Sequence, residues 1–392
     1  MAKNFAVGID IGTYRVKIMV IENPKVERGS PRIIGTGFSD SRGLRHGYII
    51  NQSDIIRSIK NALRQAEKTS GVKIKDALLS VGGIGLGSVT TNASVVISRA
   101  DLEITELDLE KAIDASRSEI PQSVALNRKI IHTIPISYKV DGKPVLGMDP
   151  IGMKGTRLEI KTLFIICLEN HLDDLVQAVE EAGVEVLDVV ASPLAASLVT
   201  LSKTQKIAGC VLANIGSETV SIVVFENNIP ISLEIFPIGS NDITNDIALG
   251  LKTPLEEAER IKLGSITSST YSKKKLEEII AARLSDIFEL IETHLKKIGR
   301  SGLLPAGIIL TGGGSGIHLI EEVAKSSLNL PSKITPLQWG ATTKETIKDA
   351  EWGVTYGLCL LGLHTETGNT FGVEMAKRAK SNIISWLKQF LP

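Results

Sequence analysis

The sequence contains few cysteines, few aromatic residues and no excess of charge of either sign. Three of its 392 residues are cysteine, and none has the spacing of a disulfide framework or metal site, so we expect buried thiols in a reducing compartment. The six histidines form no HExxH or paired pattern, so the sequence predicts no metal cage. Basic and acidic residues number 44 each, which excludes a global field that would attract nucleic acid.

Long hydrophobic runs are also missing. No stretch reaches the roughly 18 apolar residues that a membrane-spanning helix needs. The N-terminus MAKNFAVGID lacks the charged and then apolar pattern of a signal peptide. We therefore expect neither secretion nor a transmembrane segment. An apolar content of 43% in a chain of this length suffices for two or more packed lobes.

An internal repeat indicates the architecture. Residues 9–23 (IDIGTYRVKIMVIEN) align without gaps on residues 213–227 (ANIGSETVSIVVFEN), 204 positions later. Seven of the fourteen positions that begin at Asp10 and Asn214 are identical. Each copy predicts a strand, a polar turn with glycine and a second β-branched strand. The repeat therefore predicts two homologous lobes whose hairpins face each other across a cleft.

The turns of these hairpins are candidate phosphate loops. Gly12 and Gly216 permit close backbone approach, and the following Thr13 and Ser217 each add a hydroxyl group. One such turn is a weak signal, because loops of this composition are common. Two turns that face each other predict a site for a polyphosphate between the lobes.

Three further segments fit this cleft. Residues 189–201 (VVASPLAASLVTL) predict a small-residue helix begun by Ser192-Pro193, which would link the lobes. Residues 253–263 (TPLEEAERIKL) predict a helix with Glu259 and Lys262 on one face, and spacing alone favours a solvated salt bridge there. Residues 306–316 (AGIILTGGGSG) predict an apolar strand followed by glycines, where a base or sugar could lie against the backbone.

A different pattern occupies residues 81–160, which we expect to form an inserted subdomain. Its first glycines, GGIGLGS, superficially resemble a dinucleotide-binding fingerprint. The strand-like sequence SVTTNASVVIS follows them in place of a helix, which excludes the dinucleotide site.

The last residues form a basic amphipathic segment. After a linker at residues 365–376, a helix over residues 377–392 would place these apolar residues on one face: Ile383, Ile384, Trp386, Leu387, Phe390 and Leu391. The basic residues of this segment are Lys377, Arg378, Lys380 and Lys388. So short a helix must bury its apolar face on the protein core, a partner groove or a lipid interface. The aromatic and basic residues favour an anionic lipid surface.

Several segments resemble a known family. GIDIGT (8–13) and NIGSET (214–219) resemble the phosphate loops of the actin, DnaK-type chaperone and sugar-kinase ATPase superfamily. A closer resemblance, to the bacterial cell-division family FtsA, covers nearly the whole chain. It lies in PIGSNDITNDIALGLKTPLEEAERIK (237–262), IHTIPISYKVDG (131–142), PIGMKGTRLE (150–159) and the basic C-terminus.

The resemblance implies an α/β, actin-like, two-lobed fold with a duplicated ribonuclease-H-like core. The first lobe would comprise residues 1–80, 161–192 and 345–364, with the FtsA-specific subdomain inserted at 81–160. The second lobe would comprise a core at 193–240 and 300–344 and a small subdomain at 241–299. The linker and the amphipathic helix would complete the chain.

The resemblance also implies ATP with Mg²⁺ in the cleft. Asp10 would hold metal-bound water, and the other implied nucleotide contacts are Gly12, Thr13, Tyr14, Lys17, Asn214, Gly216, Ser217, Glu259, Lys262, Gly312, Gly313, Gly314 and Ser315. The family's second loop normally begins with aspartate, whereas this chain has Asn214, and Ser221 replaces a later loop aspartate. Tyr14 replaces a usually small residue. An amide lacks the charge that helps to hold hydrated magnesium or orient water. We therefore expect ATP binding with slow or absent hydrolysis, and assign no catalytic residue.

FtsA-like proteins bind the C-terminal peptide of FtsZ, polymerise with themselves and join other division proteins. The resemblance implies these partners and a peripheral place on the inner face of the cytoplasmic membrane at the division site. Residues 281–291 (AARLSDIFELI) resemble the helix that receives the FtsZ peptide, which makes Arg283 a candidate contact for its acidic residues. The pattern alone predicts only a surface arginine on an amphipathic helix.

Two alternatives share the same core. One is a PilM-like cytoplasmic scaffold of type IV pilus assembly, against which the amphipathic tail argues. The other is a sugar-kinase-like phosphotransferase, which would need the second-loop acid that Asn214 replaces.

Overall fold

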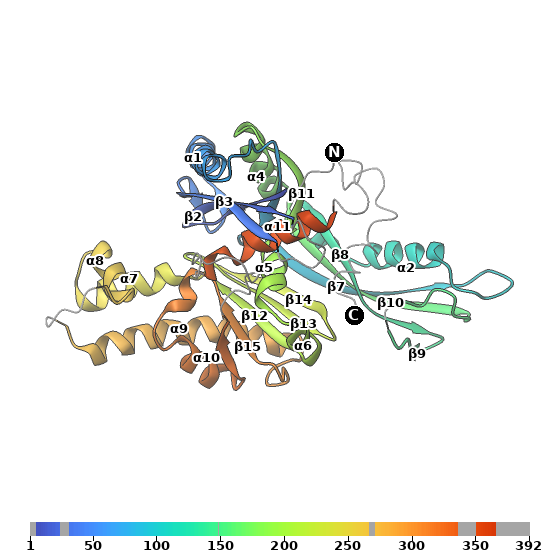
Figure 1. Ribbon diagram of the computed structural model, residues 1–392. Helices are drawn as coiled ribbons and strands as arrows, with labels where there is room; N and C mark the ends of the chain where they lie inside the picture. The colour runs from blue at the N-terminus through green and yellow to red at the C-terminus, as the bar shows by residue number, and fades with distance from the viewer. Residues whose placement is uncertain (1–4, 24–30, 148, 266–270, 336–349, 366–392) are drawn as a thin grey trace.

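Two five-stranded sheets with the same strand order form the cores of the two lobes (Figure 1). The computed structural model describes residues 5–23, 31–147, 149–265, 271–335 and 350–365. The first sheet has the order β11-β6-β1-β2-β3 and comprises β1 (Phe5–Ile11), β2 (Arg15–Glu22), β3 (Arg32–Asp40), β6 (Asp76–Val81) and β11 (Glu185–Ala191). The second has the order β14-β13-β12-β15-β16 and comprises β12 (Cys210–Ile215), β13 (Val220–Glu226), β14 (Ile229–Phe236), β15 (Ile308–Thr311) and β16 (Ser332–Ile334).

The strand directions also agree between the two sheets. In each, the first three strands form an antiparallel meander, and the fourth strand pairs in parallel with the first. Asp10 lies opposite Lys17 in the first hairpin, and Asn214 lies opposite Ser221 in the second. These positions differ by the 204 residues of the sequence repeat. The structure therefore confirms the predicted duplication and the α/β fold class.

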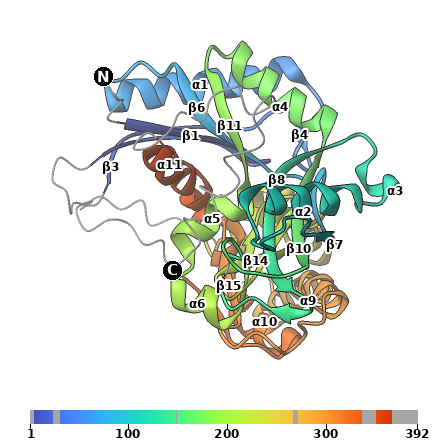
Figure 2. The same ribbon diagram turned by 90° about the vertical axis from the view of Figure 1, so that its right-hand side faces the viewer.

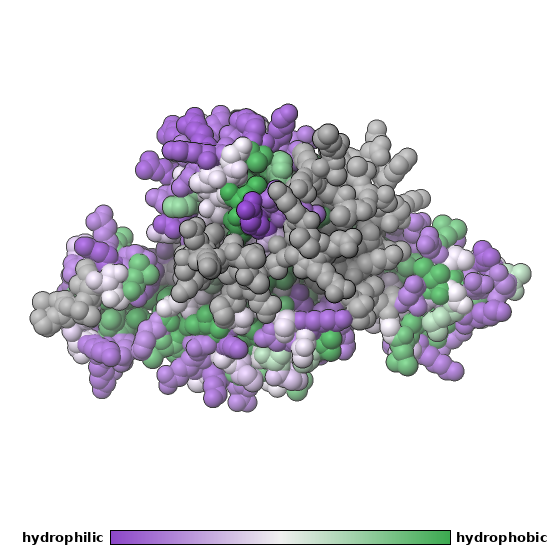
Figure 3. All heavy atoms as spheres, viewed as in Figure 1, coloured by the Kyte–Doolittle hydropathy of each residue, from purple (hydrophilic) through white to green (hydrophobic). Residues whose placement is uncertain are grey.

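Helices cover both faces of the first sheet, so its central strands are almost wholly apolar. The helix α1 (Gln52–Ser70) packs on β2 and β3, and α11 (Gly353–Thr365) packs on β1 and β2. The Asn51 side chain caps the start of α1, and Gly71 ends it in the left-handed region at φ 69°. Figure 3 shows hydrophilic residues over the top of the molecule, where α1 lies in Figure 1. The polar face of α1 thus faces outward.

A short helical segment connects the lobes. The helix α5 (Ser192–Thr200) begins at the predicted Ser192 with proline in its first turn, and α6 (Lys203–Ala208) follows it. The helix α11 packs closely on α5, because Gly357 brings its backbone against the Ala195 carbonyl. These contacts place α5 and α11 between the two sheets (Figure 2).

The inserted subdomain is a four-stranded sheet of order β7-β10-β8-β9. Its strands are β7 (Leu86–Val96), β8 (Arg128–Val140), β9 (Lys143–Pro144) and β10 (Arg157–Leu168), with helices α2 (Glu106–Ser118) and α3 (Gln122–Ala125). The strand β10 pairs with β7 and β8 along its whole length. The boundary that we expected at residue 160 thus lies inside β10. Figure 1 shows the subdomain projecting to one side of the lobes.

The base of this subdomain contacts both lobes. The Ser88 hydroxyl on β7 donates to the Leu233 carbonyl on β14 (2.8 Å) and accepts from the Leu233 amide (2.9 Å). On the first lobe, the Ala191 amide on β11 donates to His132 Nε2 on β8 (3.1 Å). The hairpin of β4 (Leu44–Arg45) and β5 (Tyr48–Ile49) lies beside α4 (Glu169–Glu181). The imidazole of His171 on α4 is hydrogen-bonded to the Gly82 carbonyl (2.7 Å). The insertion is therefore anchored next to the cleft between the lobes.

The small subdomain of the second lobe is helical. It contains α7 (Ser240–Leu251), α8 (Leu255–Lys262) and α9 (Lys273–Lys297), the last of which also packs against α10 (Ile320–Leu328). Two 3₁₀ helices, η1 (Gly313–Gly316) and η2 (Ala350–Trp352), lie at the cleft. No helix in the described ranges is long and apolar enough to cross a membrane. Of the predicted linker at 365–376, Thr365 ends α11 and the rest lies outside the described residues. The predicted amphipathic helix at 377–392 and its lipid-binding residues also lie outside them.

Candidate functional site

A cavity of about 390 Å³ lies between the two lobes. Residues of both hairpins, of the β6–β7 loop and of the segments at η1 and η2 line it. The predicted nucleotide residues that line it are Asp10, Gly12, Thr13, Tyr14, Lys17, Asn214, Gly216, Ser217, Gly312, Gly313 and Gly314. The two hairpin turns are 204 positions apart in the sequence, and the glycine run follows about a hundred positions later. The structure brings all three together.

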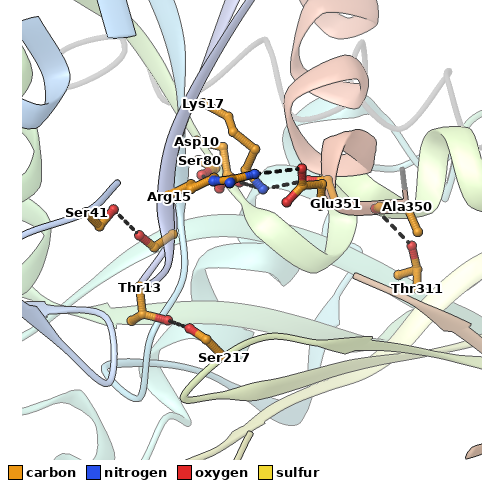
Figure 4. Close-up of polar contacts among 11 residues, drawn as sticks. Asp10, Thr13, Arg15, Lys17, Ser41, Ser80, Ser217, Thr311, Ala350 and Glu351 are labelled. Atoms are coloured by element: carbon orange, nitrogen blue, oxygen red, sulfur yellow. Dashed lines mark hydrogen bonds and ion pairs between the residues drawn. The ribbon is translucent and has the colours of Figure 1, made fainter. Parts of the chain in front are cut away.

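The two hairpin turns meet across this cavity. The Thr13 and Ser217 hydroxyls lie 2.6 Å apart and share a hydrogen bond (Figure 4). A glycine is needed in each turn, because a Cβ on Gly12 or Gly216 would lie 3.1 or 2.7 Å from a carbonyl oxygen of the same turn. The predicted facing of the two hairpins is confirmed. The two hydroxyl groups therefore meet at the cavity, where they could contact an anion.

Asp10 is held by two polar partners in the first lobe. Ser80 on β6 donates to Asp10 Oδ1 (2.7 Å), and Lys17 Nζ lies 3.2 Å from Asp10 Oδ2. Lys17 also donates to the Glu351 carbonyl (2.6 Å). Both members of the ion pair are nearly buried, at 8% and 9% exposure. The carboxylate at the cavity wall is therefore already paired with a cation (Figure 4).

The glycine run lies directly against the second hairpin. Gly312 has φ 88°, and a Cβ there would clash with Asn214 Oδ1, so the position requires glycine. Ser315 does not line the cavity as described. Its hydroxyl is buried and donates to the Gly312 carbonyl (2.7 Å), which braces the loop from behind.

Glu259 and Lys262 form the ion pair that their spacing predicts, at 2.7 Å. The lysine is not on a solvated face, however. Its side chain is 3% exposed, and it also donates to the Ser240 carbonyl (3.1 Å) and the Thr244 hydroxyl (2.8 Å). Burial lowers the pKa of Lys262, while the Glu259 carboxylate opposes that shift. Neither residue is among those that line the cavity, which Ser240 and Leu263 reach.

Sequence reasoning missed many residues of the cavity wall, among them Arg15, Ser80, Gly82, Gly83 and Glu351. Arg15 could have been found, because it precedes Lys17 by two positions on the same strand and so shares its face. Ser80 lies near the end of β6, which pairs with β1, and the two glycines directly follow this strand. No local signal marks Glu351, which reaches the site only through the tertiary fold.

Arg283 on α9 is already engaged by a carboxylate. Its guanidinium makes two hydrogen bonds to Asp246 on α7, at 2.6 and 3.0 Å, and lies 3.4 Å from Asp286. The hydrogen bond to Asp246 raises the pKa of Arg283 further. The side chain is 29% exposed, so an acidic partner would have to share it with Asp246 or displace that residue.

Comparison with known proteins gives the family. A model described as cell division protein FtsA matches residues 211–357, and one described as the SHS2 domain inserted in FtsA matches residues 83–166. The cell division protein FtsA of Borreliella burgdorferi is 31% identical over 98% of this chain and 97% of its own length. The chain belongs to the FtsA family.

Other FtsA proteins agree with this assignment. The Bacillus subtilis FtsA is 32% identical over 82% of the chain and 76% of its own length, and the Pseudomonas aeruginosa FtsA is 28% identical over 92% and 90%. The match to the inserted domain, residues 83–166, covers the sheet of β7, β8 and β9 and all but the last two residues of β10. The chain therefore belongs to a family of cell division proteins.

Solved structures show the same fold at low identity. The PilM–PilN type IV pilus biogenesis complex matches with a TM-score of 0.68 and 15% identity, covering 93% of this chain and 99% of that one. MreB5 of Spiroplasma citri bound to ADP matches with a TM-score of 0.55 and 12% identity, over 94% and 98%. Both matches support the actin-like architecture that the FtsA resemblance implied.

Proposed function

We propose that the chain binds ATP in the cleft between its lobes, with slow or absent hydrolysis. The contact of the two phosphate-loop hydroxyls, Thr13 and Ser217, at the cavity is the observation that supports this most directly. The cavity volume, about 390 Å³, lies within the range of small-molecule sites, which begins at roughly 300 Å³. The MreB5 neighbour, whose structure contains ADP, has the same fold.

Within this site Asp10 is the carboxylate that would reach a hydrated Mg²⁺, but only weakly, because Lys17 and Ser80 already engage its two oxygens. Lys17 would contact phosphate. The glycines at 312–314 leave room for a nucleoside against the backbone. Magnesium would draw charge from the phosphates in the transition state. The chain's own contribution to hydrolysis is small, because Asp10 is neutralised by Lys17 and the second loop offers the Asn214 amide in place of a carboxylate.

Hydrolysis is tested by measuring phosphate release from ATP by the purified full chain, with an Asp10→Asn variant as control. We expect turnover no faster than the control. Robust turnover that the Asp10 substitution abolishes would contradict the proposed weakness of hydrolysis.

We propose further that the protein tethers FtsZ filaments to the inner face of the cytoplasmic membrane at the division site and polymerises with itself. Membership of the FtsA family supports this role. The basic amphipathic sequence at residues 377–392 supports the membrane contact, because its apolar face and its lysines suit an anionic lipid surface. The pilus-scaffold alternative has only a fold likeness in its favour.

Co-sedimentation with anionic liposomes tests the tether. The full chain should pellet with the vesicles and carry an FtsZ C-terminal peptide with it, while a chain that ends at Gly372 should stay soluble. If neither protein binds lipid, the tether reading fails and a soluble scaffold is favoured. Filaments in electron micrographs of the lipid-bound full chain would support self-assembly.

The peptide contact has its own test at Arg283. We expect Arg283→Ala to weaken binding of the acidic peptide. Asp246→Asn should strengthen it, because the guanidinium that Asp246 now holds at 2.6 and 3.0 Å would be released. Fluorescence anisotropy of a labelled peptide measures both. A loss of affinity in both variants would contradict direct contact and indicate that the ion pair only maintains the subdomain.

A further inference from the structure

The two hairpins differ in charge at equivalent positions. In the first, Asp10 and Lys17 lie opposite each other and form an ion pair of 3.2 Å. In the second, the corresponding residues are Asn214 and Ser221, which carry no charge. The second half of the site therefore lacks the carboxylate with which a hydrated divalent cation would be held. Mg²⁺ in nucleotide sites is usually bound through one or two carboxylates together with the phosphates.

The charges on the described part of the cavity wall cancel. They belong to Asp10 and Glu351 on the acidic side and to Arg15 and Lys17 on the basic side. Lys17 pairs with Asp10, and Arg15 Nη1 lies 3.6 Å from Glu351 Oε1. Asp10 is a weak ligand for a divalent ion because Lys17 and Ser80 engage both of its oxygens, and Glu351 lies beside a guanidinium that would repel such an ion. An aspartate at position 214 would add an unpaired negative charge facing the phosphates.

Arg15 is the cation with hydrogen-bonding capacity to spare. Its Nε is buried and has no hydrogen-bond partner among the residues that the structure describes. Its two carboxylate neighbours, Asp40 at 3.5 Å and Glu351 at 3.6 Å, lie beyond the 2.7–2.9 Å of a strong charged hydrogen bond. The rings of Tyr14 and Phe38, each 5.0 Å from the guanidinium carbon, hold it in place. Figure 4 shows Arg15 beside Lys17 and Asp10 and directed toward Glu351.

We propose that Arg15 is a second phosphate-binding cation, and that the site binds nucleoside polyphosphates with little dependence on a divalent metal. This inference rests on the proposed nucleotide binding and extends it. Arg15 and Lys17 supply positive charge for the phosphates. A site with an acid in each hairpin would have to obtain that charge from Mg²⁺. A guanidinium donates to phosphate in a bidentate manner, so Arg15 can leave its long ion pairs for shorter contacts with an anionic ligand.

Calorimetric titration of the full chain with ATP, in excess Mg²⁺ and in EDTA, tests this proposal. For the wild type we expect the Kd to differ by less than about threefold between the two conditions. Asn214→Asp, which changes charge at nearly constant shape, should weaken binding in EDTA by at least about tenfold relative to Mg²⁺. Arg15→Gln should weaken binding in EDTA by about tenfold, and Arg15→Lys should recover part of that loss.

The matched control is Arg57→Gln, at an arginine 69% exposed on α1, which should leave both constants unchanged. Thermal unfolding of each variant verifies that it is folded. Binding of the wild type only with Mg²⁺ would overturn metal independence while leaving nucleotide binding intact. An Arg15→Gln variant that binds like the wild type would overturn the role of Arg15. No binding under either condition would overturn the proposed nucleotide site itself.

Discussion

Removing the Lys17 ammonium should destabilise the ligand-free protein far more than one lost contact suggests. Each side chain of the Lys17–Asp10 pair is 11% exposed. At their 3.2 Å separation and an effective dielectric constant of about 20, the attraction is about 5 kcal/mol. Desolvation of the two ions opposes it by several kcal/mol each. The complete pair therefore adds little net stability, whereas a single ion left in place retains its desolvation cost.

The substitution Lys17→Met removes the charge while largely keeping the side-chain volume. Asp10 then keeps the Ser80 hydroxyl as its remaining described partner, and we expect a cost of about 3–5 kcal/mol. A chain of 392 residues has an unfolding entropy of about 0.8 kcal/mol/K, so Tm should fall by roughly 4–6 K. Asp10→Asn should also be destabilising, because it leaves the Lys17 ammonium buried without its carboxylate partner. The double variant should return to within about 2 kcal/mol of the wild type, because only hydrogen bonds remain lost.

Thermal unfolding without nucleotide, followed by circular dichroism, measures all three variants as a double-mutant cycle. The control is Lys73→Met, which removes an ion pair of similar length, 3.0 Å to Glu67, from a lysine that is 75% exposed. Its effect should stay below about 1 kcal/mol. Additive losses from the two single substitutions at the cleft, or a Lys17 effect no larger than that of Lys73, would refute the reasoning.

Two other predictions concern the fold. Gly357→Ala should lower the free energy of unfolding by about 1–3 kcal/mol or more, because its Cβ would clash with the Ala195 carbonyl on α5. The control Gly87→Ala, with nothing near its Cβ, should be neutral in the same thermal unfolding assay. Burial lowers the pKa of Lys206 to about 8, against 10.5 in the unfolded chain. Between these pH values the unfolded state binds more protons, so stability should rise with pH. Relative to Lys206→Met, the wild type should gain roughly 3 kcal/mol over that range; parallel curves for the two proteins would contradict the burial effect.

The FtsA resemblance anticipated the actin-like fold, and its two loop motifs, GIDIGT and NIGSET, lie at the hairpin turns of β1–β2 and β12–β13. The helix start at Ser192 and the strand before the glycine run are where their sequences predict them. The predicted end of the insertion, residue 160, falls inside β10. Along β10, charged residues alternate with apolar residues up to Lys161, and an apolar run from Leu163 continues the same strand. The change of pattern therefore falls inside one strand and does not mark its end.

The candidate site was predicted in part, for a similar reason. Residues of the two hairpin turns and the glycine run carry local signals, since a tight turn requires glycine wherever it occurs. Ser315 was expected in the cavity but braces the loop behind it. Glu351 and Ser80 were not expected, because each acts through a partner distant in sequence.

The sequence by itself determined that the chain contains two related lobes and which loops face the cleft, and its resemblance to FtsA added the α/β fold and the missing acid of the second loop. These are local properties, written in hydrophobic periodicity, turn residues and the repeat. Only the tertiary structure decided how the charges in the cleft are paired. This pairing depends on which strands and helices pack together. It joins Lys17 to Asp10 and Arg15 to Glu351, and beside the cleft it joins Lys262 to buried carbonyl and hydroxyl oxygens. Burial sets the strength of such interactions, and burial is a property of the whole fold.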